Sequence, residues 1–173
     1  MKCIKEDQFK IMPWKNGGGI TTELYSLPAE EADQFKLRLS RAKINKDGPF
    51  SLFKGIDRHL LVVEGAGCIL QSPHESLVLT QDSPPYFFAG ETIYQCKLIN
   101  GPVIDFNLMI DRSWGTAQIT LGSYQQLTKI LCKSDLLLFF DFTKNELYVL
   151  KEGEEFESDS SKFLTVTIDT CFI

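Results

Sequence analysis

The residues best suited to binding or catalysis lie in a short stretch near the N-terminus, where three consecutive glycines, Gly17 to Gly19, follow Trp14, Lys15 and Asn16. A glycine held in regular structure costs folding roughly 0.5–1 kcal/mol relative to alanine, so a run of three indicates a backbone that turns through positive φ or approaches something closely. An indole ring, a cation, an amide and the Glu23 carboxylate flank this backbone, which makes a binding site one hypothesis. The alternative is a structural turn or bulge between two strands, with Trp14 as a core anchor.

The glycine run does not have the features of a phosphate-binding loop. It lacks both the dinucleotide spacing and the Gly-Lys-Ser/Thr ending, and Thr21, Thr22 and Tyr25 favour a strand after it. A nucleotide site would need a helix N-terminus directly behind the glycines to supply free N–H groups. We expect a strand there instead.

Two segments further along the chain place charged groups at alternate positions. In the segment 35–41, alternation sends Lys36, Arg38 and Ser40 to the face opposite the apolar residues. In the segment 103–110, it likewise places Asp105 and Asn107 on one face. In a barrel these mixed faces could line the lumen while the apolar faces pack under a second layer.

Burial of Asp105 would cost several kcal/mol unless a cation or several donors lay nearby, and Arg38, Arg58 and Arg112 could serve. One hypothesis is a pocket in which an arginine grips a ligand carboxylate bidentately while Asn107 fixes its orientation. The structural alternative is a solvated face, or a buried ion pair that fixes strand register. The residues alone leave both open.

For acid–base catalysis the candidates are Asp105, Glu23 and His59, whose pKa values the surroundings could tune. His59 begins an apolar strand and is more typical of a structural histidine, and no Ser-His-Asp signature or nucleophile elbow supports covalent hydrolysis. The catalytic residues, if there are any, stay unknown at this point.

Composition limits the classes of protein to which the chain can belong. The net charge of −5 argues against nucleic-acid binding, which needs a clustered basic patch, and the 43% apolar content favours a filled globular interior. The N-terminus lacks the apolar segment of a signal peptide and no run of about 18 apolar residues follows, so we expect a cytoplasmic protein without membrane association. Five scattered cysteines predict reduced thiols, and two histidines make a metal site or other cofactor unexpected.

Short alternating segments separated by Gly, Pro, Asn and Asp predict an all-β protein, a sandwich or barrel. Helical signal is confined to 28–33 and 123–132, and the polar stretch 154–161 predicts a loop. The expected strands are 8–12, 20–26, 35–44, 59–64, 68–71, 76–80, 93–99, 103–110, 117–121, 136–142, 146–151 and 163–169.

A weak internal sequence repeat indicates two similar halves, each with an apolar strand, a second strand and a turn that contains glycine and acidic residues. We expect a first barrel over residues 1–115 that carries the site, and a smaller second half over residues 116–173, with strands exchanged between the halves. Most of the unusual polar residues lie in the first half.

Taken together, these motifs resemble the HutD/Ves family of bacterial proteins. The resemblance covers residues 8–115 well and is strongest in four places: Pro13-Trp14-Lys15-Asn16-Gly17-Gly18-Gly19 with Thr22-Glu23, Arg38-Leu39-Ser40-Arg41-Ala42, Asp47-Gly48-Pro49-Phe50-Ser51 with Gly55-Ile56-Asp57-Arg58, and Gly101-Pro102 with Asp105-Phe106-Asn107-Leu108-Met109 and Arg112.

The resemblance implies a cupin-like double β-barrel (bicupin) and a link to histidine utilisation, where members are thought to sense a small pathway acid such as formylglutamate. Leu37 stands where the family pattern leads us to expect a tryptophan, so the ligand could differ here. The His-x-His pair of metal-dependent cupins is missing, so the cupin resemblance brings no metal with it. It places the family's signature positions at Trp14, Asn16, Arg38, Arg58, Asp105, Asn107 and Arg112.

The leading hypothesis is a metal-free protein that binds a small carboxylate in the first barrel. The alternatives are a metal-free cupin-type isomerase or lyase acting on a small organic acid, and a structural module whose signature residues are ion pairs. Edge strands could also pair two copies into a homodimer. The ligand is expected to contact Trp14, Asn16, Gly17, Gly18, Arg38, Arg58, Asp105, Asn107 and Arg112.

Overall fold

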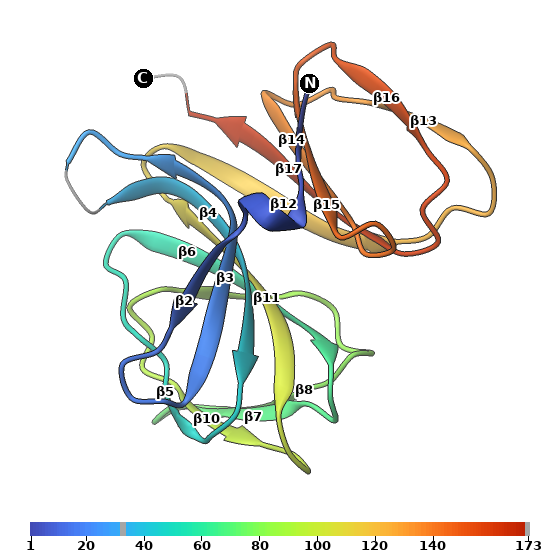
Figure 1. The fold of residues 1–173 in the computed structure, drawn as a ribbon. Helices are drawn as coiled ribbons and strands as arrows, with labels where there is room; N and C mark the ends of the chain where they lie inside the picture. The colour runs from blue at the N-terminus through green and yellow to red at the C-terminus, as the bar shows by residue number, and fades with distance from the viewer. Residues whose placement is uncertain (32–33, 172–173) are drawn as a thin grey trace. The chain divides into compact units, whose positions relative to one another are not determined.

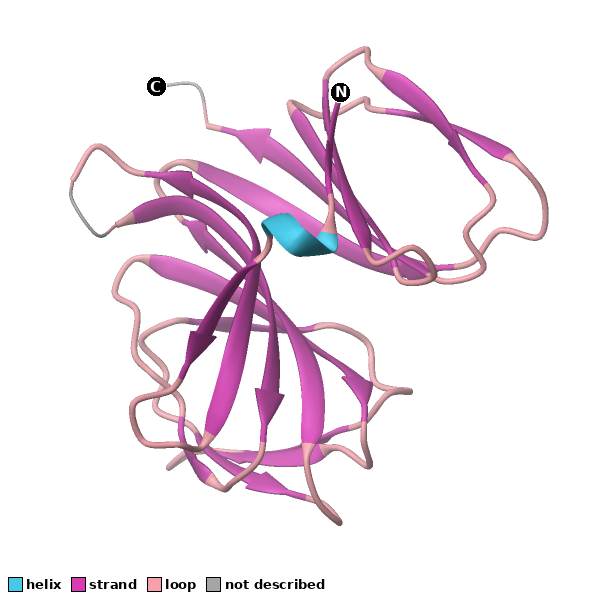
Figure 2. Ribbon diagram, in the orientation of Figure 1, coloured by secondary structure: helices cyan, strands magenta, loops and turns pink. Residues whose placement is uncertain are grey.

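The computed structural model describes residues 1–31 and 34–171, and nearly all of their regular structure is strand (Figure 2). The exception is a single 3-10 turn, η1 (Glu6–Gln8), and no helix in this part of the chain is long and apolar enough to cross a membrane. The all-β prediction is confirmed. The strands are β1 (Lys2–Ile4), β2 (Lys10–Pro13), β3 (Gly19–Pro28), β4 (Phe35–Ile44), β5 (Gly48–Pro49), β6 (Ile56–Glu64), β7 (Cys68–Gln71), β8 (Ser76–Leu79), β9 (Tyr86–Ala89), β10 (Gln95–Leu98), β11 (Val103–Asp111), β12 (Gly115–Gly122), β13 (Thr128–Leu131), β14 (Leu136–Asp141), β15 (Glu146–Lys151), β16 (Glu155–Ser158) and β17 (Phe163–Thr170).

The chain divides into two compact units. Residues 10–112 form one, and residues 1–9 join the chain from Ser113 onward to form the other. The sequence placed this boundary after residue 115, whereas the structure places it after Arg112. The first residues join the C-terminal unit because β1 pairs with β15, with Cys3 opposite Tyr148.

The unit of residues 10–112 is built from two antiparallel sheets. The larger has the order β2-β3-β4-β11-β6-β9 and the smaller the order β5-β10-β7-β8, and Figure 1 shows the long strands β3, β4 and β11 running side by side. In the register of β4 and β11, Ser40 lies opposite Asn107 and Ala42 opposite Asp105. The period-two alternation therefore brings the polar side chains of both strands to one face of the large sheet.

Apolar side chains from both sheets fill one part of this unit's interior. Leu60 and Val62 of the large sheet pack with Cys68, Leu70 and Cys96 of the small sheet, and all five are at most 2% exposed. Trp14 and Phe50 pack against the same cluster. The core therefore holds the two sheets together and also supports the segment that carries the glycine run.

The glycine run forms the tight connection between β2 and β3. The Trp14 N–H donates to the Gly19 carbonyl (2.9 Å), the Gly17 N–H donates to the Trp14 carbonyl (3.0 Å), and Gly17 has φ of +66°. A Cβ on Gly19 would lie 2.5 Å from the Lys43 carbonyl oxygen and 3.1 Å from the Trp14 ring. The structural interpretation of the glycines is thus correct: one residue needs positive φ and another permits a close approach.

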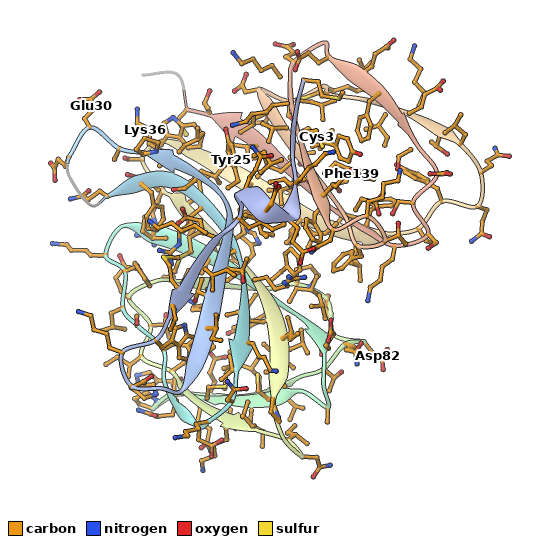
Figure 3. The ribbon with its side chains drawn as sticks, in the orientation of Figure 1. Cys3, Tyr25, Glu30, Lys36, Asp82 and Phe139 are labelled. Carbon is orange, nitrogen blue, oxygen red and sulfur yellow. The ribbon has the colours of Figure 1, made fainter. Side chains whose placement is uncertain are left out.

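In the other unit, aromatic rings occupy the interior. Its sheets have the orders β1-β15-β14-β17-β12 and β13-β16. Phe139, labelled in Figure 3, is fully buried, stacks on Phe163 at 4.8 Å between ring centroids, and meets Phe156 edge-on at 5.1 Å. Tyr124 and Tyr148 complete the cluster.

Three local predictions from the sequence are wrong. The segment 123–132 is not helical, because residues 128–131 form β13 and pair with β16, which lies in the stretch expected to be a loop. Ile130 turns inward from β13 and packs in the aromatic cluster, and this burial outweighs the polar composition of the paired segment. The sequence also predicts a helix over 28–33. Residues 28–31 contain no helix, and Pro28 is the last residue of β3; residues 32 and 33 lie outside the described residues.

We predict that Gly19→Ala lowers the free energy of unfolding by about 1–3 kcal/mol, because the added methyl group overlaps the Lys43 carbonyl and presses on Trp14. Gly48→Ala is the matched control: a Cβ there meets nothing within 4 Å, so the change should stay within about 0.5 kcal/mol. Urea unfolding of both variants measures the difference. Equal losses in the two variants would show that the close approach at Gly19 is not what requires glycine.

Candidate ligand-binding site

A cavity of about 400 Å³ lies within the unit of residues 10–112. Its polar floor comes from the alternating faces of β3, β4, β6 and β11, and its remaining walls come from residues 14–16 and 49–53. Three cations and one carboxylate lie among the lining side chains, so the cavity is positively charged. The residues are Trp14, Lys15, Asn16, Thr21, Arg38, Ser40, Ala42, Ile44, Pro49, Phe50, Ser51, Phe53, Arg58, Asp105, Asn107 and Met109.

Arg58 on β6 is only 4% exposed. Its guanidinium carbon lies 5.2 Å from the ring centroid of Phe50, 5.6 Å from Phe53 and 4.9 Å from Phe88, so three rings surround the charge. Its Nε donates to Asn107 Oδ1 (3.4 Å) and its Nη1 to the Ser51 carbonyl (3.2 Å). Burial lowers the pKa of Arg58 to about 10, which leaves it charged at neutral pH.

Arg38 on β4 is the second arginine of the cavity. Its Nη2 lies 3.2 Å from the sulfur of Met109, and its guanidinium carbon lies 4.9 Å from the ring centroid of Phe35 and 5.5 Å from that of Phe53. Its Nε is buried and has no hydrogen-bond partner among the described residues. Desolvation lowers the pKa of Arg38, and the charge of Glu23 opposes that shift.

Asp105 on β11 is 3% exposed, and its Oδ1 is buried without a hydrogen-bond partner in the described part of the chain. Burial raises the pKa of this carboxyl to about 7, against the opposing effects of the Arg58 charge and the Ala42 backbone N–H. Among the described residues, no ion pair within 4 Å includes Asp105, Arg38 or Arg58. The three charges therefore share one cavity without neutralising one another in direct contact.

The N-terminal wall of the cavity is held in place by local hydrogen bonds. The indole Nε1 of Trp14 donates to Thr21 Oγ1 (2.8 Å), and the side-chain oxygen of Asn16 accepts from the Gly18 N–H (2.9 Å). The Gly17 and Gly18 N–H groups are thus occupied within the turn, and neither glycine lines the cavity.

Arg112 also lies apart from the cavity, although the sequence grouped it with the other arginines. Its Nη2 lies 2.7 Å from Asp57 Oδ1 and 3.2 Å from Glu91 Oε2, and its side chain is 46% exposed. Because two carboxylates already hold the guanidinium, it serves to join β6 to the β9–β10 connection. Of the nine predicted site residues, the structure gathers Trp14, Asn16, Arg38, Arg58, Asp105 and Asn107 around the cavity and leaves out Gly17, Gly18 and Arg112.

Of the three candidate bases, only Asp105 reaches the cavity. His59 follows Arg58 on β6 and meets Phe87 edge-on at 5.1 Å between ring centroids; burial lowers its pKa. Glu23 is not a lining residue. The residues that the structure describes contain no group of three or more His, Cys, Asp and Glu side chains able to hold a metal ion.

Sequence reasoning missed Phe53 and Met109 as lining residues. Alternation from Asp105 and Asn107 already placed Met109 on the same face, so that signal was present. Phe53 lies in an irregular segment between β5 and β6, where no periodicity indicates the direction of a side chain. In the structure its ring lies beside both guanidinium groups.

Comparison with known families adds a second line of argument. The family model HutD matches residues 6–169, almost the whole chain. The chain belongs to the HutD family. The resemblance seen in the sequence is thereby confirmed.

Two curated relatives share part of the chain. An uncharacterized 21.2 kDa protein in the hutC 3' region of Pseudomonas putida is 38% identical over 115 residues, which are 63% of this chain and 57% of that protein. Protein Ves of Citrobacter koseri is 32% identical over 110 residues, again 63% of this chain and 57% of the relative. Each match therefore spans little more than half the length of the relative.

Solved structures extend the likeness over the whole fold. HutD from Pseudomonas fluorescens superposes with a TM-score of 0.78 at 25% identity and covers 99% of both chains. A conserved protein of unknown function from Pseudomonas aeruginosa reaches a TM-score of 0.82 at 23% identity, with the same coverage, and this second likeness concerns the fold alone.

We predict that Asp105→Asn changes how stability depends on pH. An aspartate has a pKa near 3.9 in an unfolded chain, and burial raises the pKa of Asp105 to about 7 in the folded protein. Between these two pH values the Asp105 carboxyl is therefore ionised in the unfolded state and mostly protonated in the folded state. Wild-type stability should then fall relative to the variant by about 1.4 kcal/mol per pH unit up to neutral pH and level off above it.

Urea unfolding at pH 5, 6, 7 and 8 measures this difference. Trp114→Phe in both proteins leaves Trp14 as the fluorescent reporter of the unit that carries the cavity. A difference between the two proteins that stays constant from pH 5 to pH 8 would mean that Asp105 has an ordinary pKa in the folded protein.

Proposed function

We propose that this protein binds a small carboxylate-bearing metabolite in the cavity of residues 10–112, with Arg38 and Arg58 as the groups that hold the anion. The observation that carries the proposal is a pair of guanidinium groups lining one cavity while neither forms an ion pair within 4 Å among the described residues. Arginine forks match carboxylate geometry, and desolvation strengthens such pairs.

The rest of the cavity suits a small organic acid. Its volume of about 400 Å³ lies in the range of small-molecule sites, and apolar walls with a few fixed polar groups are typical of them. Phe50, Phe53 and Trp14 supply the walls. Asn107 accepts from Arg58 through its side-chain oxygen, which aims its amide nitrogen away from that arginine and makes it available to orient a ligand.

The family and the relative named for its place beside hutC support a link to histidine utilisation. We propose that the bound acid belongs to that chemistry, with N-formylglutamate, glutamate, urocanate and histidine as the first compounds to test. Binding without turnover would suit a sensor or regulator.

A second candidate function is catalysis by a metal-free isomerase or lyase. It rests on Asp105, the one carboxylate of the cavity, whose raised pKa of about 7 suits a general base. Incubating the protein with each acid and recording proton NMR spectra decides between the two: new resonances, or exchange of a carbon-bound proton with deuterated solvent, would favour the enzyme, and unchanged spectra of a bound acid would favour the binding protein.

Thermal unfolding with and without each acid tests binding. A ligand at about 100 times its dissociation constant adds roughly 2.7 kcal/mol to stability, so we expect one acid to raise the melting temperature by several degrees. Arg38→Met and Arg58→Met should remove the shift, because the anion then loses its charge partners.

Arg112→Met is the matched control, since it removes an arginine that already has carboxylate partners outside the cavity. It should lower the melting temperature of the free protein and leave the ligand-induced shift unchanged. A shift that persists in Arg38→Met and Arg58→Met, or that disappears in Arg112→Met alone, would place the anion elsewhere.

A further inference from the structure

Residues 50–55, here called the strap, connect β5 to β6 and form one wall of the cavity. Two backbone hydrogen bonds fasten the strap to the connection between β9 and β10. The Phe50 N–H donates to the Tyr94 carbonyl (2.9 Å). The Phe53 N–H donates to the Gly90 carbonyl (2.9 Å). These two bonds fix the strap on either side of its two middle residues.

The middle residues, Ser51 and Leu52, are only weakly held. Ser51 is exposed to solvent although it lines the cavity, and Leu52 is 55% exposed. Among the described residues, one hydrogen bond holds this pair: the Ser51 carbonyl accepts from Arg58 Nη1 (3.2 Å). A segment with a single hydrogen bond and little buried surface opens at a low cost in free energy.

That hydrogen bond uses the same guanidinium that is proposed to hold the anion. A guanidinium can grip a carboxylate through its Nε and Nη2 or through its Nη1 and Nη2. In Arg58, Nε donates to Asn107 Oδ1 (3.4 Å) and Nη1 donates to the Ser51 carbonyl, so one nitrogen of each pair is already engaged. A carboxylate that grips Arg58 with both oxygens therefore competes with one of these two acceptors.

The Ser51 carbonyl is the acceptor that gives way more easily. A carboxylate is a stronger acceptor for a guanidinium than a neutral carbonyl, so the exchange favours the anion. Once released, the Ser51 carbonyl can accept from water, because Ser51 is exposed. Asn107 is half-buried in the cavity lining on β11, and releasing its oxygen would leave a polar atom unpaired beside the anion.

From these contacts we infer that the strap is a ligand-operated switch: an anion held by Arg58 displaces the Ser51 carbonyl, and residues 51–52 detach from the cavity wall while both ends of the strap stay fastened. The inference rests on the proposed function, because it assumes that Arg58 holds the anion. Its consequence is a surface around Leu52 that differs between the free and the occupied protein, which is what a sensor needs in order to report its ligand.

Backbone NMR of the isotope-labelled protein tests the switch, with N-formyl-L-glutamate, L-glutamate, urocanate and L-histidine added separately. A bound acid should shift the Ser51 carbonyl carbon to lower frequency, because the carbonyl exchanges a cationic donor for water. It should also lower the order parameter of the Leu52 amide from the rigid value of about 0.85 to below about 0.6. The amides of Phe50 and Phe53 should keep their order parameters, since their hydrogen bonds remain.

Glycine variants test the same coupling through affinity, each compared with the alanine variant at its own position so that only backbone freedom differs. A glycine favours the released strap, so calorimetric titration should show Leu52→Gly binding the acid about two- to fivefold more tightly than Leu52→Ala. Lys54→Gly and Lys54→Ala are the matched controls and should bind equally. Lys54 is also exposed, but it lies between Phe53 and Gly55, whose N–H groups are both bonded to the β9–β10 connection.

The failures of the two proposals differ. If an acid shifts the Arg58 Nε–H signal while the Ser51 carbonyl carbon and the Leu52 order parameter stay unchanged, Arg58 holds the anion with the strap in place, and the switch is wrong. A rise in the Leu52 order parameter, or equal affinities of Leu52→Gly and Leu52→Ala, would also overturn it. If none of the four acids binds, the proposed function fails and the switch fails with it.

Discussion

The burial of a permanent positive charge, the Arg58 guanidinium, is the constraint on which the cavity depends. A desolvated guanidinium is costly unless its surroundings compensate, and here three aromatic rings, an amide oxygen and a backbone carbonyl do so. These partners come from β9, β11 and the segment 50–53. The chain must therefore bring all of these elements to β6, and doing so encloses the space beside Arg58.

The remaining polar groups of the cavity follow from this arrangement. Arg38 and Arg58 both lie against the Phe53 ring, and the charge of Arg38 lowers the pKa of Arg58, so an anion bound to both would relieve their repulsion. Asp105 offsets part of the charge from a distance but does not pair with either arginine within 4 Å. The cavity thus keeps the net positive charge that a structural ion pair would have cancelled. The interiors of the two units also differ. The unit of residues 10–112 contains this cavity, whereas aromatic rings around Phe139 fill the interior of the other unit.

Much of the cavity could be predicted from the sequence because it obeys strand periodicity. Alternation placed Arg38 with Ser40 and Asp105 with Asn107 on shared faces, and hydrogen-bonded pairing of β4 with β11 joins the two faces. Periodicity could not separate Arg112 from the other arginines, because its partners Asp57 and Glu91 are distant in the sequence and only the folded chain brings them together. The same holds for Phe53, whose position depends on the path of an irregular segment. Short strands such as β13 and β16 escaped prediction because their pairing depends on burial against the aromatic cluster rather than on their own composition.

The glycine run shapes both the turn between β2 and β3 and one wall of the cavity. Its glycines satisfy backbone geometry, and their N–H groups are used within the turn, so they do not themselves contact a ligand there. By allowing Trp14, Lys15 and Asn16 to approach the cavity, they nevertheless determine its N-terminal wall. The proposal that Arg38 and Arg58 hold an anion is best tested by NMR of the arginine Nε–H groups. With resonances assigned through Arg38→Lys, Arg58→Lys and Arg112→Lys, titration with the acid that stabilises the protein most should shift the Arg38 and Arg58 signals saturably and leave that of Arg112 in place. Unchanged Arg38 and Arg58 signals at a saturating concentration of a bound acid would show that neither arginine holds the anion.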